Sequence, residues 1–95
     1  MQFEWDEAKR LANLGKHKID FEDIADVWKG DFIDVVGVRI VQGELRILAL
    51  GVMEDDVEVI AVVYTVRKSS IRLISARRAR KNERQVFRSR FGYGR

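Results

Sequence analysis

Side chains that can handle phosphate groups and protons occur in two parts of the sequence. One part is the pair Lys16–His17, and the other is the segment after residue 66, with Arg67, Arg72, Arg77 and Glu83. Cleavage of RNA without metal needs a group that removes the 2′-hydroxyl proton, cations that stabilise charge on phosphorus, and a group that protonates the departing 5′-oxygen. These residue types can supply all three, so they are the catalytic candidates.

His17 and Glu83 each have a structural alternative. His17 is the only histidine in the sequence, and histidine ordinarily exchanges a proton near neutral pH, so it is a candidate acid or base. It is equally well placed to cap the carbonyl end of a helix, where a cation is favourable. Glu83 could form an ion pair with Arg80 one helical turn away, anchor several arginines, or carry a proton. Its inward-facing position among apolar residues favours the anchor.

Charge is distributed very unevenly along the chain. Residues 1–66 carry 7 basic and 14 acidic residues, whereas residues 67–95 carry 11 basic residues and one acidic residue, Glu83. Most of these cations are arginines, whose forked donors suit phosphate, so we expect a polyanion or an acidic protein as partner. The alternative is a basic helix that is only solvated or pairs with the acidic half. Candidate RNA-binding residues are Arg78, Arg80, Lys81, Arg84 and Arg88.

Several other kinds of site are disfavoured. The chain has no cysteine and one histidine, so carboxylates are left as metal ligands, and Glu54-Asp55-Asp56 lacks the spacing of a calcium loop. No phosphate-cradling glycine pattern and no distinctive Ser-His-Asp set is visible. We therefore expect neither metal nor cofactor. The sequence shows no signal segment or membrane span, and the lack of cysteine suits a reducing compartment, so we expect a cytoplasmic protein.

The length of 95 residues predicts one domain covering residues 1–95. Asp6 is the expected N-cap of a helix that runs to about Lys16, and Gly15 is the residue expected to terminate it. Asp20 is the expected N-cap of a second, short helix that closes at Lys29–Gly30.

Alternating apolar and polar residues then predict strands. Residues 33–41 and 44–53 form a hairpin around Gly43, with Arg39 and Arg46 alternating with apolar neighbours. Residues 57–66 form a central strand, in which Tyr64 packs in the core, and residues 71–75 form a fourth strand. Ser75 is the expected N-cap of a basic helix from Ala76 to Phe91, and residues 92–95 are expected to be flexible.

The predicted fold class is therefore α+β: two N-terminal helices, a four-stranded antiparallel sheet and a basic C-terminal helix. In this arrangement Arg67 and Arg72 flank the turn between the last two strands. They either reach a phosphate group or remain solvated.

Several stretches along the chain resemble those of one protein family, the BrnT toxins. The matching residues are Phe3-Glu4-Trp5-Asp6 with Lys9; Asn13, Lys16-His17 and Phe21; Ala49-Leu50-Gly51; Val63-Tyr64-Thr65 with Arg67; and Arg72 to Ala76 followed by Arg77, Ala79, Glu83 and Arg84. The order and spacing of these stretches cover most of the chain. Lys18 stands where the family usually has glycine, and residues 31–42 match weakly.

The resemblance implies a RelE-like ribonuclease fold and RNA cleavage that inhibits translation. It also implies a co-encoded BrnA-like antitoxin that neutralises the toxin, in a hetero-oligomer that binds operator DNA through the antitoxin. Carried onto this sequence, the implied site residues are Lys16, His17, Arg67, Arg72, Arg77 and Glu83.

Two functions of other classes remain open. The chain could be a non-catalytic module that binds nucleic acid through its basic helix or forms half of a repressor complex. It could also be a structural partner whose basic helix docks an acidic protein. Formation of cleaved RNA separates the enzyme from the binding module, and RNA affinity separates both from the structural partner.

Overall fold

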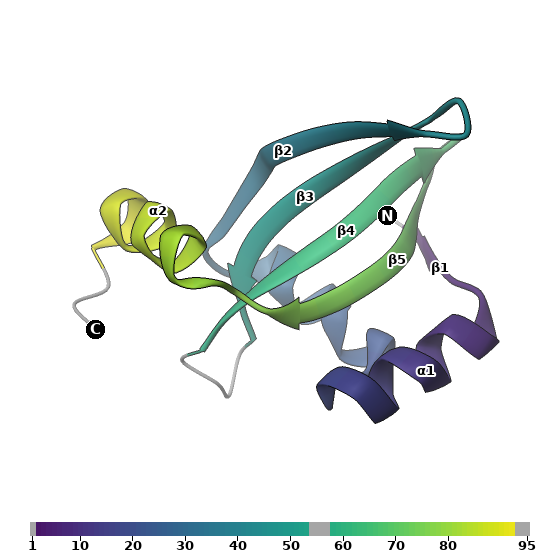
Figure 1. Cartoon of the computed structure of the whole chain (residues 1–95), viewed down its shortest axis with the longest axis horizontal. Helices are drawn as coiled ribbons and strands as arrows, with labels where there is room; N and C mark the ends of the chain where they lie inside the picture. The colour runs from purple at the N-terminus through teal and green to yellow at the C-terminus, as the bar shows by residue number, and fades with distance from the viewer. Residues whose placement is uncertain (1, 54–57, 93–95) are drawn as a thin grey trace.

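The computed structural model describes residues 2–53 and 58–92, with the backbone alone for residues 33–36. The described residues form one five-stranded sheet in the order β1-β5-β4-β3-β2, with three helices around it (Figure 1). In chain order the elements are β1 (Gln2–Glu4), α1 (Glu7–His17), the 3₁₀ helix η1 (Phe21–Lys29), β2 (Phe32–Val41), β3 (Glu44–Val52), β4 (Val59–Arg67), β5 (Ser70–Arg78) and α2 (Lys81–Phe91). The predicted α+β class is confirmed.

The sheet has one strand more than predicted, so the expected four-stranded antiparallel sheet is wrong in this respect. The extra strand, β1, pairs in parallel with β5, with Phe3 beside Ile71 and Glu4 beside Arg72. Three residues are too few to show an alternating pattern, and the partner strand lies at the other end of the sequence. Only the tertiary fold brings the two together.

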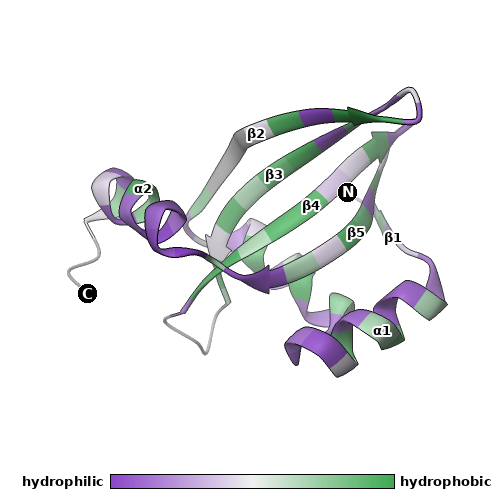
Figure 2. Ribbon diagram, viewed as in Figure 1, coloured by the Kyte–Doolittle hydropathy of each residue, from purple (hydrophilic) through white to green (hydrophobic). Residues whose placement is uncertain are grey.

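Each face of the sheet packs against different helices. On one face, which we call the helix face, α1 and η1 cover a core that includes Phe21, Ile24, Val62 and Leu73. The predicted core position of Tyr64 is confirmed, because it is 3% exposed in this core. On the opposite face α2 covers a smaller core around Leu50, Ala61 and Phe87. Accordingly, Figure 2 shows mostly hydrophobic residues along β3 and β4 and mostly hydrophilic residues on α2.

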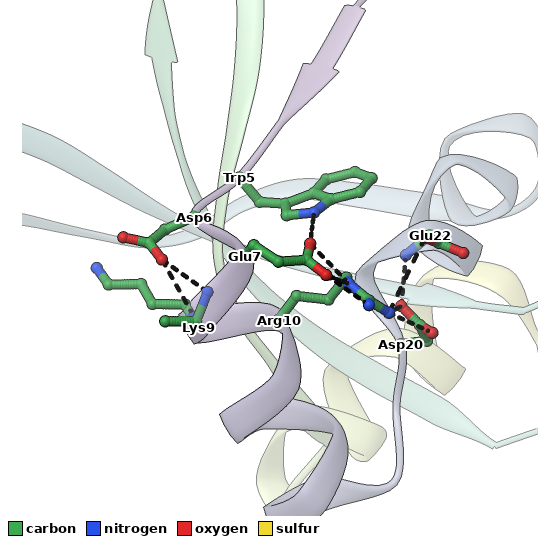
Figure 3. Close-up of polar contacts among 8 residues, drawn as sticks. Trp5, Asp6, Glu7, Lys9, Arg10, Asp20 and Glu22 are labelled. Carbon is green, nitrogen blue, oxygen red and sulfur yellow. Dashed lines mark hydrogen bonds and ion pairs between the residues drawn. The ribbon is translucent and has the colours of Figure 1, made fainter.

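Both predicted N-terminal helix caps are confirmed, and one arginine links them. Asp6 accepts hydrogen bonds from the backbone N–H of Ala8 at 2.8 Å and of Lys9, and Asp20 accepts from that of Glu22 at 3.0 Å. The guanidinium of Arg10 lies between the two helix starts (Figure 3). It binds Glu7 at 2.6 Å and Asp20 at 3.0 Å. These contacts fix α1 and η1 relative to each other on the helix face.

The end of α1 differs from the prediction. The helix does not stop at Gly15 but runs to His17, and Lys18 then caps it in the left-handed conformation, with φ 62°. This is the conformation that glycine adopts without strain, and it is costly for other L-residues. Lys18 therefore adds strain at the end of α1.

Asn13 attaches α1 to the edge of β5. Because β1 covers only residues 70–72, the rest of β5 is an edge on that side. The Asn13 side chain donates to the carbonyl of Ala76 at 2.9 Å and accepts from the Ala76 N–H at 3.0 Å, as a neighbouring strand would do. It also donates to the carbonyl of Ile19 at 3.1 Å. The last turn of α1 is thereby held beside the end of β5.

The predicted start of the last helix is wrong. Strand β5 continues to Arg78, Ser75 pairs with Val63 instead of capping a helix, and α2 begins only after its N-cap residue Arg80. Pairing with β4 outweighs the helical preference of the alanine and arginine residues, since tertiary contacts override local propensity. Residues 54–57, which include Glu54-Asp55-Asp56, and the tail residues 93–95 lie outside the described residues.

Strand β5 also contains a bulge. Its register shifts so that Ser75 pairs with Val63 but Leu73 pairs with Tyr64, which leaves Ile74 as an extra residue. A bulge resets the alternation of side chains along a strand. Leu73 and Ala76 both reach the helix face, and Arg72 and Arg77 point to the opposite face.

Candidate functional site

The sheet face opposite α1 and η1 carries a row of arginines, and we call it the arginine face. In the register Arg39 pairs with Arg46, and Arg72 pairs with Thr65 and Glu4. Because Ile47 pairs with Tyr64, Arg46 lies beside Thr65 across the next pair of strands. The same alternation places Arg67 and Arg77 on this face. Helix α2 covers only one end of it (Figure 1).

A pocket of about 460 Å³ opens on the arginine face. Four arginines surround it: Arg39, Arg46, Arg77 and Arg80. Between them lie apolar and small residues of the strands, among them Leu48, Val63, Ile74 and Ser75. Four cations around one hollow concentrate positive potential there, which suits a polyanion.

Glu83 holds one of these arginines in place. Its two carboxylate oxygens accept from Nη1 and Nη2 of Arg77 at 2.8 and 3.0 Å, and Oε1 also accepts from the backbone N–H of Arg80 at 2.7 Å. The Arg77 guanidinium keeps the pKa of the buried Glu83 carboxyl below its ordinary value. Glu83 in turn raises the pKa of Arg77. These contacts fit the predicted role of Glu83 as an anchor. Glu83 binds Arg80 through the backbone N–H and not through the side chain, as the alternative Arg80–Glu83 ion pair would require.

Arg67 and Arg72 lie further along the arginine face, each paired with a carboxylate. Nη1 of Arg72 donates to Glu4 at 2.7 Å, and Nε of Arg67 donates to Glu44 at 2.8 Å. The bond from Arg67 lowers the pKa of Glu44. In each pair, some N–H groups of the arginine have no acceptor among the described residues. The two arginines can therefore still bind a phosphate oxygen.

Lys16 and His17 do not line the pocket. They are the last residues of α1, beside the end of β5, where the carbonyl of His17 accepts from Nη1 of Arg78 at 3.3 Å. The position of His17 in the last helical turn agrees with its structural alternative, a cation at the carbonyl end of a helix. The structure therefore brings Arg77 and Arg80 together in the pocket and leaves these two candidates at the sheet edge.

The predicted RNA-binding residues lie on different surfaces of the protein. Arg80 lines the pocket. Arg78 points to the helix face, where its guanidinium donates to the carboxylate of Glu58 and to the backbone carbonyl of His17. Arg84 donates to the carbonyl of Ala79 at 2.8 Å, and Lys81 and Arg88 lie on α2 without lining the pocket.

Comparison with known families decides which group this chain falls in. The sequence model of a family described as the ribonuclease toxin BrnT of type II toxin–antitoxin systems matches residues 5–83. The chain belongs to the BrnT family. The match spans every residue that lines the pocket, together with Glu83. Among curated proteins, no match was found.

Membership of the BrnT family supports two general statements about function. The family is one of ribonuclease toxins, and a type II toxin–antitoxin system implies an antitoxin partner. The family-level resemblance seen in the sequence is thus confirmed. Within the described residues, no three histidine or acidic side chains lie close enough together to hold a metal ion. None of the described helices has the length and hydropathy needed to cross a membrane.

Three residues of the arginine face were missed as site candidates in the sequence: Glu4, Arg39 and Arg46. For the two arginines a signal was present, because the hairpin around Gly43 was predicted. Counting outward from the Gln42–Gly43 turn pairs Val41 with Glu44 and Arg39 with Arg46, as observed. Glu4 gave no comparable signal, since its place depends on the unpredicted strand β1.

Proposed function

We propose that this BrnT-family chain is a metal-independent endoribonuclease that cleaves RNA at the arginine pocket and thereby inhibits translation. One observation carries the proposal. The pocket gathers four arginines, and no described carboxylate forms an ion pair with Arg39, Arg46 or Arg80. Such an excess of cations in a concave surface attracts the phosphate backbone of a nucleic acid.

The proposed reaction is attack of the ribose 2′-oxygen on the adjacent phosphorus. The bond from phosphorus to the 5′-oxygen breaks, which leaves a 2′,3′-cyclic or 3′-phosphate end and a 5′-hydroxyl end. Arg77 stabilises the additional negative charge on the phosphoryl oxygens, because Glu83 holds its guanidinium ready before RNA binds. Arg72 and Arg67 bind the strand further along the same face.

The proton transfers need a second set of groups. His17 and Lys16 remain the proposed carriers for a strand that crosses the end of β5, where Arg78 follows Arg77 directly.

We further propose that a cognate BrnA-like antitoxin neutralises the toxin, in a hetero-oligomer that binds operator DNA through the antitoxin. The family description supports an antitoxin partner. RNA as substrate is supported by that description together with the charge of the pocket.

The proposal is tested by expressing the chain without antitoxin and following growth and protein synthesis. We expect growth arrest for the unaltered chain and growth for Arg72→Ala and Arg77→Lys at matched protein levels. Lysine is used at position 77 because alanine would leave buried Glu83 without its cation. Arg90→Ala is the matched control, since Arg90 is exposed on α2 away from the pocket, and it should arrest growth. Unchanged arrest in both site variants would overturn the proposed mechanism.

A further inference from the structure

Arg39 and Arg46 face each other, and no described carboxylate forms an ion pair with either of them. They are directly opposite in the pairing of β2 with β3, so both guanidinium groups extend from the same face. Like charges directly opposite each other destabilise a pair of strands. In a free protein this arrangement therefore has a cost that an anion between the two side chains would remove.

Arg46 shows a second, independent sign of a missing ligand. Its Nε is buried from solvent and has no hydrogen-bond partner. A charged donor that has lost water without gaining an acceptor is costly, and such groups in native structures call for an explanation. An oxyanion bound to the same guanidinium in the pocket would offset this cost.

No described side chain supplies that anion. Arg67, Arg72 and Arg77 are each paired with a carboxylate, whereas no ion pair of the described residues involves Arg39 or Arg46. The carboxylate of Glu44 attracts Arg46 through space, but it forms its ion pair with Arg67 at 2.8 Å. The partner must come from outside the described chain.

The two arginine pairs of the pocket are separated by apolar residues. Arg39 and Arg46 come from β2 and β3, Arg77 and Arg80 from the end of β5 and the start of α2, and Leu48 and Val63 lie between them. A nucleotide has the same order of chemistry, with a ribose and base between two phosphates. A pocket of about 460 Å³ also lies within the range of about 300–1,000 Å³ typical of small-ligand sites.

We propose that Arg39 and Arg46 bind one phosphodiester group of the RNA strand, next to the phosphodiester group that Arg77 binds. The inference rests on the proposed function for the identity of the strand. It assigns to the β2–β3 hairpin a second phosphate site that positions the RNA, while Arg77 acts on the reacting phosphate.

The test measures binding separately from cleavage. The probe is a single-stranded RNA with 2′-O-methyl groups, which cannot be cleaved, and its Kd is measured at several salt concentrations. We expect Arg39→Gln and Arg46→Gln to bind at least fivefold more weakly than Arg90→Gln, which removes the same charge from α2. The slope of log K against log salt should fall by about 0.7, the value for one lost phosphate contact on a single strand. Inorganic phosphate alone should compete poorly.

Each outcome separates the inference from the function on which it rests. With cleavable RNA, both variants should raise KM more than they lower kcat. If Arg39→Gln and Arg46→Gln bind the probe as Arg90→Gln does, the second phosphate site is wrong even if cleavage is intact. If they bind antitoxin weakly but RNA normally, the pair serves protein carboxylates and the inference is overturned. If the chain cleaves no RNA but probe binding depends on both arginines, the phosphate site stands and the ribonuclease proposal fails.

Discussion

Glu83 binds Arg77 through both oxygens of its carboxylate, at 2.8 and 3.0 Å, across the junction between β5 and α2. The same carboxylate accepts the backbone N–H of Arg80, the N-cap residue of α2. One buried acid therefore determines both where the helix begins and how a pocket arginine is held. The pairing is bidentate, which fixes the plane of the guanidinium as well as its position.

Glu83→Gln should destabilise the protein by about 1–3 kcal/mol, because Arg77 then keeps a half-buried charge without its carboxylate. Urea denaturation checks this value. Glu58→Gln is the control, since Glu58 pairs with Arg78 in an exposed position, where an ion pair contributes about 0–1 kcal/mol. Equal losses in the two variants would contradict the anchoring role of Glu83.

The same pair predicts an acid-sensitive part of the stability. Arg77 lowers the pKa of Glu83 in the folded protein, so its contribution is complete above the unfolded value of about 4.3. It is lost as the pH falls below that value and through the lowered folded pKa. The free energy of unfolding of the unaltered chain should therefore fall more steeply below about pH 4.5 than that of Glu83→Gln. Parallel curves would show that another carboxylate is responsible.

Arg39→Gln should make the free protein more stable while weakening its binding of RNA. Removing one of two opposed like charges relieves about 0.2–1 kcal/mol in a pair of strands. Thermal denaturation without ligand measures the gain against Arg90→Gln, which should show no comparable gain. A lower Tm for Arg39→Gln than for Arg90→Gln would mean that the opposed arginines do not strain the hairpin.

Lys18→Gly should stabilise the protein by up to about 1 kcal/mol, because Lys18 is held at φ 62°. The loss of the hydrogen bond from its Nζ to the carbonyl of Gly15 offsets part of this gain. Ala12→Gly makes the contrasting control, since glycine inside the same helix costs about 1 kcal/mol. If both variants are destabilised, the left-handed cap is not strained in the way proposed.

Local signals in the sequence predicted the features that depend on neighbouring residues. The caps Asp6 and Asp20 and the hairpin around Gly43 were found in this way, because side chain, backbone and turn lie within a few residues of each other. The features that were missed depend on distant partners. Strand β1 exists because β5 offers it an edge, and β5 extends to Arg78 because β4 pairs with it.

The candidate site shows the same division. The basic segment after residue 66 and the role of Glu83 as an anchor could be inferred from charge and helical position. Local patterns did not predict that Arg77 faces the pocket while neighbouring Arg78 faces α1, because the bulge at Ile74 resets the alternation of side chains along β5. They also grouped Lys16 and His17 with these arginines, although α1 holds them at the sheet edge.

The most direct test of the central claim is cleavage of labelled single-stranded RNA by the purified chain, free of antitoxin and in excess EDTA, with identification of the new ends. We expect 2′,3′-cyclic or 3′-phosphate and 5′-hydroxyl ends from the unaltered chain and from Arg90→Lys. We expect at least tenfold slower cleavage by Arg77→Lys. RNA that remains intact, on its own and on translating ribosomes, or equal rates in Arg77→Lys and Arg90→Lys, would contradict metal-independent cleavage at the arginine pocket.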